Sequence, residues 1–269
     1  CAGNYDSRIQ ISGQDELAEV AYEFNLLADR LQKTEEVRRE FVSNASHELK
    51  TPLASIKLLS DSILQTEGIS KESVAEFLQD INEEIDRLTR ITERLLQLTK
   101  LDHVPPSAAE DCDLNTLVEK IGELLRENAF QAQVTLEDQV PQGPKVHFDK
   151  DGLYQVVFNL MENAIKYNRP GAKVTIQAQK QENGELVHLQ IQDTGIGMAP
   201  EELPHIFERF YRVDKARSRE RGGTGLGLAI VSDWLQVLGG KIQVESVLGQ
   251  GTTFTVTLPA ARPPEEDSL

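Results

Sequence analysis

Two stretches of the chain carry apolar residues at alternating steps of three and four, which places them on one face of an α-helix. The first stretch begins near Leu17 and continues with little turn chemistry through Phe41. A further stripe ends near Gly68, and the second stretch starts after Ser70, whose side chain suits the N-cap of a helix. The pattern predicts two long helices joined by a turn into a helical hairpin.

The apolar positions of this hairpin exceed what two helices can cover. They are Leu49, Leu53, Ile56, Leu59 and Ile63 in the first helix and Val74, Leu78, Ile81, Ile85, Leu88, Leu95 and Leu98 in the second. Pairing two copies would bury both stripes in a four-helix bundle, so the sequence predicts a homodimer. Pro52 cannot donate to the carbonyl of Glu48, and a bend is therefore expected there.

The pattern changes after residue 104. The stretch Val104–Asp111 contains two adjacent prolines and is expected to be an interdomain linker. Beyond it, strands and helices mix without regular alternation, which favours a two-layer α/β sandwich. Helices are expected from about 114, after the cap Asp149, and over 226–238. Strands are expected at 134–136, 146–148, 174–176 and 187–191 and on both sides of 249–251. A hairpin turn is expected at 183–184.

The predicted fold class is thus α+β and multidomain. A helical hairpin that forms a dimeric four-helix bundle is followed by a two-layer α/β sandwich, and residues 262–269 are expected to be a disordered tail.

The acidic composition excludes one class of partner. The 269 residues include 44 acidic and 28 basic ones, for a net charge of -16, which argues against nucleic-acid binding. The stretch 209–221 departs from this balance with an excess of cations. It favours a phosphate-facing lid, and an ordinary solvated loop is the alternative.

The N-terminal residue, the apolar runs and the cysteines indicate the cellular location of the protein. No apolar run is long enough to cross a bilayer, and the chain begins with Cys1 instead of methionine. We therefore expect a piece of a longer protein from which a membrane-spanning part is missing. Cys1 and Cys112 have no metal-ligand spacing and form no disulfide framework, which favours a reducing compartment.

Candidate chemistry lies in two separate places. His47, in the run His47–Pro52, is a potential nucleophile. More than a hundred residues later, Asn159 and Asn163 lie four apart and share a helical face, so both amides can address one site. Amide oxygens suit Mg2+, and a polar helix surface is the alternative.

Two glycine-containing motifs belong to the second place. Asp193 follows a predicted strand and precedes two glycines, where a carboxylate can accept from the exocyclic amine of adenine; an ordinary turn is the alternative. The glycines of Gly223–Gly227 open a predicted helix whose amides can face phosphate. They follow no strand and lack Gly-Lys-Ser/Thr, which excludes Rossmann and P-loop sites. The order of the motifs suggests a nucleotide pocket that supplies a phosphoryl group to the imidazole.

Six motifs in this order resemble those of a sensor histidine kinase of a two-component system. His47–Pro52 resembles the phosphoacceptor box of its dimerisation (HisKA) domain, and Gly3–Asn25 resembles the latter half of a HAMP linker. The N, G1, F, G2 and G3 boxes of its ATP-binding (HATPase_c) domain resemble Asn159–Tyr167, Asp193–Gly197, Ile206–Tyr211, Gly223–Gly227 and Gly249–Thr253. The resemblance implies a HAMP-type linker and signalling helix over 1–36, the dimerisation and phosphotransfer domain over 37–104, the catalytic domain over 105–261 and the tail over 262–269.

The resemblance also implies roles for single residues. His47 would accept the phosphoryl group, Glu48 would hold the imidazole tautomer in its own or the partner chain, and Thr51 would orient water for removing phosphate from a partner aspartate. Phe207 and Phe210 would anchor a lid. The implied ATP-binding residues are Asn159, Asn163, Lys166, Tyr167, Asp193, Gly195, Gly197, Phe207, Arg209, Phe210, Gly223, Gly225, Leu226, Gly227 and Thr252, with Asn163 as the Mg2+ ligand.

The implied function is ATP-dependent autophosphorylation of His47, followed by transfer to an aspartate of a response regulator receiver domain, with phosphatase activity toward that regulator as a further output. The alternatives are an ATPase with the same nucleotide fold and a noncatalytic scaffold that relays conformational signals. The expected location is the cytoplasmic portion of a bacterial cell-membrane protein. The input signal, the regulator, the balance of the two activities and the choice of cis or trans phosphorylation stay open.

Overall fold

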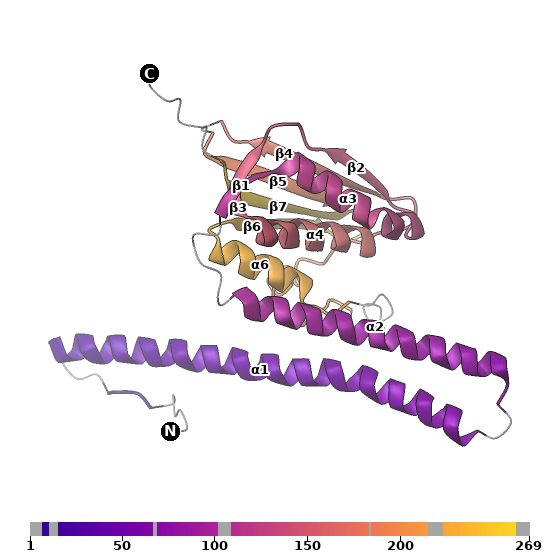
Figure 1. Ribbon diagram of the computed structural model, residues 1–269. Coiled ribbons are helices and arrows are strands. Elements are labelled where there is room, and N and C mark those ends of the chain that lie inside the picture. The colour runs from indigo at the N-terminus through magenta and orange to yellow at the C-terminus, as the bar shows by residue number, and fades with distance from the viewer. Residues whose placement is uncertain are drawn as a thin grey trace. The chain divides into compact units, whose positions relative to one another are not determined.

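The computed structural model of the chain describes residues 7–10, 16–66, 69–101, 109–182, 184–214 and 223–261 (Figure 1). By its internal contacts the chain divides into two compact units, Cys1–Leu88 and Thr89–Leu269. None of the helices within the described ranges combines the length and the apolar character that a membrane crossing requires.

The first unit is built on α1, a helix of 50 residues over Glu16–Gln65. It confirms the predicted long helix that runs through the His47 segment. Pro52 lies inside α1 without ending it, and the helix axis changes direction over the second half of α1 (Figure 1). This curvature agrees with the bend expected at a residue that cannot complete the backbone ladder.

The second helix, α2 over Lys71–Leu101, begins in the first unit and ends in the second. The hydroxyl oxygen of Ser70 accepts from the amide of Ser73 at 3.0 Å, which confirms the predicted N-cap. The turn residue Gly68 lies outside the described residues. Because Ser70 and Ser73 are three positions apart, this cap could be recognised from the sequence alone.

The hairpin leaves large apolar side chains exposed in the single chain. Leu53, Leu78 and Ile85, all members of the predicted stripes, have exposed fractions of 55%, 50% and 46%. Large apolar side chains that stay exposed along a predicted helix face are available to an interface. The surface that a second hairpin would cover is therefore present, and the homodimer stays a prediction.

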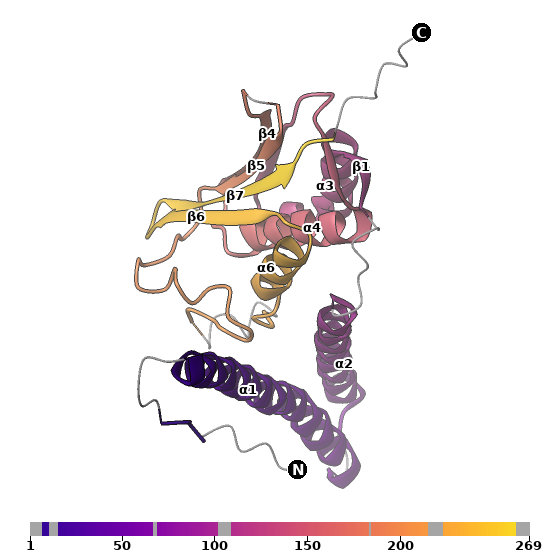
Figure 2. The same ribbon diagram turned by 90° about the vertical axis from the view of Figure 1, so that its left-hand side faces the viewer.

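The second unit is a two-layer α/β sandwich, as predicted. Its elements are β1 (Ala109–Asp113), α3 (Leu114–Gln131), β2 (Thr135–Gln139), β3 (Lys145–Asp149), α4 (Lys150–Lys166), β4 (Lys173–Lys180), β5 (Leu186–Asp193), α6 (Gly227–Val237), β6 (Lys241–Val247) and β7 (Gly251–Pro259). One sheet has the order β2-β4-β5-β7-β6, with β2 and β4 parallel and the other pairs antiparallel. The helices α3, α4 and α6 cover one face of it (Figures 1 and 2).

The sheet has one apolar face because its strands alternate. In β5, Val187, Leu189 and Ile191 are buried while Gln190 and Gln192 are exposed. On the helical side, α4 and α6 come close at Gly152, where a Cβ would lie 2.4 Å from the Trp234 ring. This packing holds the start of α4 against the last turn of α6, so the two helices lie in the same layer.

Local predictions in the second unit are mostly confirmed. Asp149, the predicted cap of α4, accepts from the amide of Gly152 at 2.7 Å. The structure adds that Asp113 caps α3 in the same way, by accepting from the amide of Thr116 at 3.0 Å. One prediction was wrong: residues 109–111 belong to β1 and not to the linker, because β1 pairs with β3 more than thirty residues later. The rest of the predicted linker, Asn183 of the predicted turn and the tail 262–269 lie outside the described residues.

Candidate functional site

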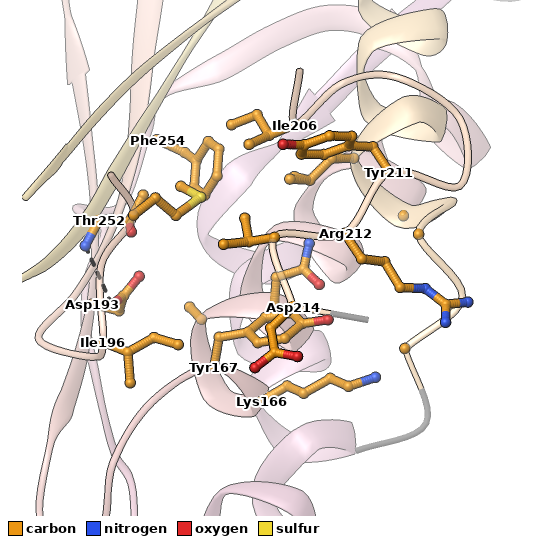
Figure 3. Close-up of a pocket in the computed structure, with 18 of the residues that line it drawn as sticks. Lys166, Tyr167, Asp193, Ile196, Ile206, Tyr211, Arg212, Asp214, Thr252 and Phe254 are labelled. Atoms are coloured by element: carbon orange, nitrogen blue, oxygen red, sulfur yellow. Dashed lines mark hydrogen bonds between the residues drawn. The ribbon is translucent and has the colours of Figure 1, made fainter. Parts of the chain in front are cut away.

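A cavity in the second unit brings together residues that the sequence predicted for the nucleotide site. They come from α4, from the end of β5, from the segment that leads into α6, and from β7. Nine of them line it: Asn163, Lys166, Tyr167, Asp193, Gly197, Gly223, Gly225, Gly227 and Thr252. Figure 3 shows Asp193 and Thr252 on one side of the cavity and Lys166 and Arg212 on the other. The cavity therefore has an acidic end and a cationic end.

The acidic end is built on Asp193, the last residue of β5, which is only 8% exposed. Its Oδ1 accepts from the amides of Gly195 and Thr252 at 2.8 and 3.3 Å. Burial raises the pKa of Asp193 to about 6, and these two hydrogen bonds oppose the increase. Both donors bind Oδ1, so among the described residues Oδ2 has no donor and is available to a ligand.

Glycine is required where the backbone passes close to Asp193. A Cβ on Gly195 would lie 2.8 Å from the Asp193 carboxylate and 2.7 Å from the carbonyl oxygen of Tyr167. Gly197 has a φ of 62°, and its Cβ would lie 2.0 Å from the carbonyl oxygen of Val247. Gly195 thus shapes the wall without lining the cavity, whereas Gly197 does line it.

The two predicted asparagines have different positions. Asn163 lines the cavity, but Asn159 is buried behind it, 3% exposed, and donates to the carbonyl of Gln155 at 2.7 Å. Gly227, the first residue of α6, packs against Asn159, since a Cβ there would lie 3.0 Å from Oδ1. Asn159 therefore supports the junction of α4 and α6, and Asn163 faces the site.

The cationic end contains Lys166, the last residue of α4. Burial lowers the pKa of Lys166 to about 8; Glu162 opposes the decrease, and Arg94, Arg90 and Arg212 add to it. The three arginines are thus near enough to act on the ammonium electrostatically. A ligand with several negative charges would relieve this repulsion.

Arg94 is a cavity residue that sequence reasoning missed. It lies in the part of α2 that belongs to the second unit. Its guanidinium donates to Glu162 Oε2 at 2.7 Å and to Thr224 Oγ1 at 2.6 Å. Nothing in the helical pattern distinguishes Arg94 from other polar residues of α2, because its partners are 68 and 130 positions away.

The predicted lid residues Phe207, Arg209 and Phe210 do not line the cavity, nor does Leu226. Arg209 donates to Asp233 on α6 at 2.9 Å. Phe210 has a φ of 66°, and its amide donates to the carbonyl of Gly225 at 2.8 Å. The next two residues, Tyr211 and Arg212, line the cavity instead, and the cations at 215–221 lie outside the described residues.

The apolar walls were also missed. Ile196, Ile206 and Phe254 line the cavity; Ile196 lies next to Asp193, and Phe254 and Ile206 lie along the upper side of the view (Figure 3). The sequence could have indicated Phe254, because it alternates with the polar residues of a predicted strand next to Thr252. Apolar side chains of this kind suit the faces of a planar ring.

His47 lies in the first unit, on α1, and is exposed. Glu48 is turned toward α2, where its carboxylate lies 3.7 Å from the guanidinium of Arg87. The hydroxyl of Thr51 donates to the carbonyl of His47 at 3.2 Å. A histidine open to solvent can approach a partner, whereas Glu48 is engaged elsewhere in this conformation.

These features define a class of protein. An acid, glycines and apolar walls at one end of a cavity, with cations and a glycine-opened helix at the other, have the chemistry to suit a planar ring that carries negative charge. The chain adds an exposed histidine on a helical hairpin. The class is a nucleotide-dependent phosphotransfer protein.

Comparison with known families makes this class specific. Residues 37–104 match the His Kinase A (phospho-acceptor) domain, and residues 148–262 match the histidine kinase-, DNA gyrase B- and HSP90-like ATPase family. The chain belongs to the sensor histidine kinases, and its second matched region is an ATP-binding domain.

Individual relatives agree with this membership. The sensor histidine kinase WalK of Bacillus subtilis is 36% identical over 243 residues, which cover 88% of this chain and 39% of WalK. The histidine kinase AdeS of Acinetobacter baumannii is 25% identical with a TM-score of 0.64, covering 80% of this chain and 98% of that structure. The histidine kinase ThkA, solved in complex with the response regulator protein TrrA, has the same fold, with a TM-score of 0.64 at 19% identity over 86% of this chain and 64% of ThkA. The chain thus spans about two fifths of the WalK sequence.

Proposed function

We propose that this chain is an ATP-dependent protein histidine kinase that phosphorylates His47 and passes the phosphoryl group to an aspartate of a response regulator. One observation carries the proposal. Residues of the N, G1 and G2 motifs, which are up to 64 positions apart in the sequence (from Asn163 to Gly227), line one cavity, and the same chain exposes His47 on a helix.

The cavity suggests how ATP would bind. The Oδ2 of Asp193 would accept from the adenine amine, with the ring between the apolar walls, and the phosphates would lie toward Lys166 and the start of α6. Guanine lacks an amine at the corresponding position. The site should therefore prefer ATP to GTP.

Mg2+ is a further part of the proposal, with Asn163 as its protein ligand. Among the described residues there is no group of three or more His, Cys, Asp or Glu side chains that could hold a metal ion. An ion here would therefore take most of its oxygen ligands from phosphate and water, which is usual for Mg2+. When bound, it would neutralise phosphate charge.

In the chemical step, the unprotonated ring nitrogen of His47 would attack the γ-phosphorus of ATP. The new N–P bond forms as the bond from phosphorus to the bridging oxygen breaks, and ADP leaves. Glu48, or its counterpart in the partner chain, would accept a hydrogen bond from the other ring nitrogen and so fix the tautomer. Lys166 and Arg212 would offset the charge on the transferred group.

The test is incubation with ATP labelled at the γ-phosphate. Acid-labile label should appear on the wild-type chain and be absent from His47→Gln, while label retained by His47→Gln would contradict the assignment. Sustained phosphate release without protein labelling would favour the ATPase alternative. Absence of nucleotide binding in calorimetry would favour the scaffold.

Three further parts of the proposal have their own tests. Transfer to a regulator, the partner class of ThkA, should appear as label moving from this chain to a receiver protein over time. A Thr51→Ala variant should lose phosphatase activity while keeping autophosphorylation. Fractionation of cells that produce the natural protein would test the expected location at a bacterial cell membrane.

A further inference from the structure

A small charge cluster lies next to the phosphoacceptor residue inside the first unit. Arg87 of α2 is held between two carboxylates, that of Glu48 on α1 at 3.7 Å and that of Glu84 on α2 at 3.6 Å. The side chains of Arg87 and Glu48 are only 14% and 18% exposed, and that of Glu84 is 25% exposed. The hairpin thus encloses two acids and one guanidinium beside His47.

The distances show that Arg87 forms an ion pair with each acid but a hydrogen bond with neither. Both N···O separations exceed the 2.7–3.2 Å of an N–H···O hydrogen bond. The Oε2 of Glu84 is buried and has no hydrogen-bond partner among the described residues. A buried carboxylate oxygen without a donor is unfavourable, so Glu84 competes with Glu48 for the same guanidinium.

Glu48 is the residue that this competition affects most directly. It follows His47 in the sequence, but its side chain points toward α2 while that of His47 is exposed. An ion pair with Arg87 favours the conformation in which the carboxylate stays inside the hairpin. Closure of Arg87 on Glu84 would remove this ion pair and so weaken the preference of Glu48 for the interior of the hairpin over an imidazole.

We propose that Arg87 is a positioning residue for phosphorylation of His47: it retains Glu48 within the hairpin and releases it by closing on Glu84. This inference rests on the proposed function, in which Glu48 orients the imidazole. It makes Arg87 a restraint on autophosphorylation. Glu84 then acts as the competitor that relieves the restraint.

Two substitutions in the full chain should have opposite effects on the initial rate of His47 labelling. Arg87→Met removes the ion pair with Glu48 and should raise the rate about two- to five-fold, the range expected for the coupling of a single ion pair. Glu84→Gln removes the competitor and should lower the rate by a similar factor. Arg87→Lys keeps the charge without the planar fork and should return the rate toward that of the wild type.

The matched control is Glu83→Gln, which removes the same charge from an exposed neighbour on α2 and should leave the rate unchanged. In a Glu48→Gln background, Arg87→Met should give no increase, because its effect acts through Glu48. Thermal unfolding of each variant identifies losses of structure. If Arg87→Met does not fold, Glu84→Gln decides, since it removes an oxygen that lacks a partner.

Changes in the same direction for Arg87→Met and Glu84→Gln, or an increase that persists without Glu48, would show that Arg87 is a structural ion-pair residue and overturn the inference. An unchanged rate in both variants would do the same. Failure of the proposed function would look different, because label would then be absent from the wild type or retained by His47→Gln.

Discussion

Replacing Asp193 by asparagine should change stability and nucleotide affinity in opposite directions. The substitution preserves the shape of the side chain, and the amide oxygen can still accept from the amides of Gly195 and Thr252. Two things change: a buried negative charge disappears, and the atom left for the ligand becomes an N–H donor. That donor would face the donor amine of adenine.

The stability effect follows from the pKa of Asp193, raised from 3.8 to about 6 by burial. A raised folded-state pKa means that folding favours the protonated form, so stability falls as the pH rises from about 4 through about 6. At pH 7.5 the full cost of burying the charge is present, and two pKa units correspond to about 3 kcal/mol. Asp193→Asn should recover part of it, about 1–3 kcal/mol, and the gain should shrink as the pH falls to 5.

The affinity effect is the loss of a hydrogen bond to a charged acceptor, about 1.5–3 kcal/mol, or roughly a 10- to 150-fold increase in Kd for ATP. Calorimetric titration with ATP measures this change, and thermal unfolding without nucleotide measures stability. Asp151→Asn is the matched control, since Asp151 is an exposed acid in the first turn of α4 and should change both quantities little. A variant that is less stable than the wild type and binds ATP equally well would refute the reasoning.

Other predictions concern the pH range, a glycine and the dimer. ATP affinity should be greatest between about pH 6 and about 8, because Asp193 loses its charge below this range and Lys166 loses its charge above it; a flat calorimetric profile from pH 5 to 9 would contradict this. Gly197→Ala places a Cβ 2.0 Å from a carbonyl oxygen at a φ of 62° and should lower the unfolding temperature by more than Gly171→Ala, where φ is 78° but nothing lies within 4 Å. Equal effects of the two substitutions would mean that backbone strain alone matters. Leu53→Lys places a charge on the exposed apolar stripe and should shift sedimentation from dimer to monomer, whereas an unchanged dimer would place the interface elsewhere.

The helices and their caps could be predicted because their causes are local. Ser70, Asp113 and Asp149 each accept from an amide three residues later, so a short stretch of sequence contains both partners. The apolar spacing of α1 likewise depends only on neighbouring turns. The role of the glycines near Asp193 could also be predicted, because a residue without a side chain lets another part of the backbone come close.

Strand pairing and long-range contacts could not be predicted from the sequence. β1 looked like linker because its sequence is polar, and only pairing with β3 makes it a strand. The ion pair of Arg209 with Asp233, at 2.9 Å, could not be predicted from the sequence either, because the two residues are 24 positions apart. A charged side chain chooses its partner by proximity in space, which neither residue type nor spacing determines.

The sequence by itself therefore determined the helical hairpin, the mixed sandwich and most of the motif residues that line the cavity, since each depends on periodicity or on short motifs. The tertiary structure alone decided which of them face the cavity. It placed Asn163 inside and Asn159 behind, added Arg94, and turned Glu48 toward Arg87. The physical reason is that burial and charge pairing arise between segments that meet only when the chain has folded.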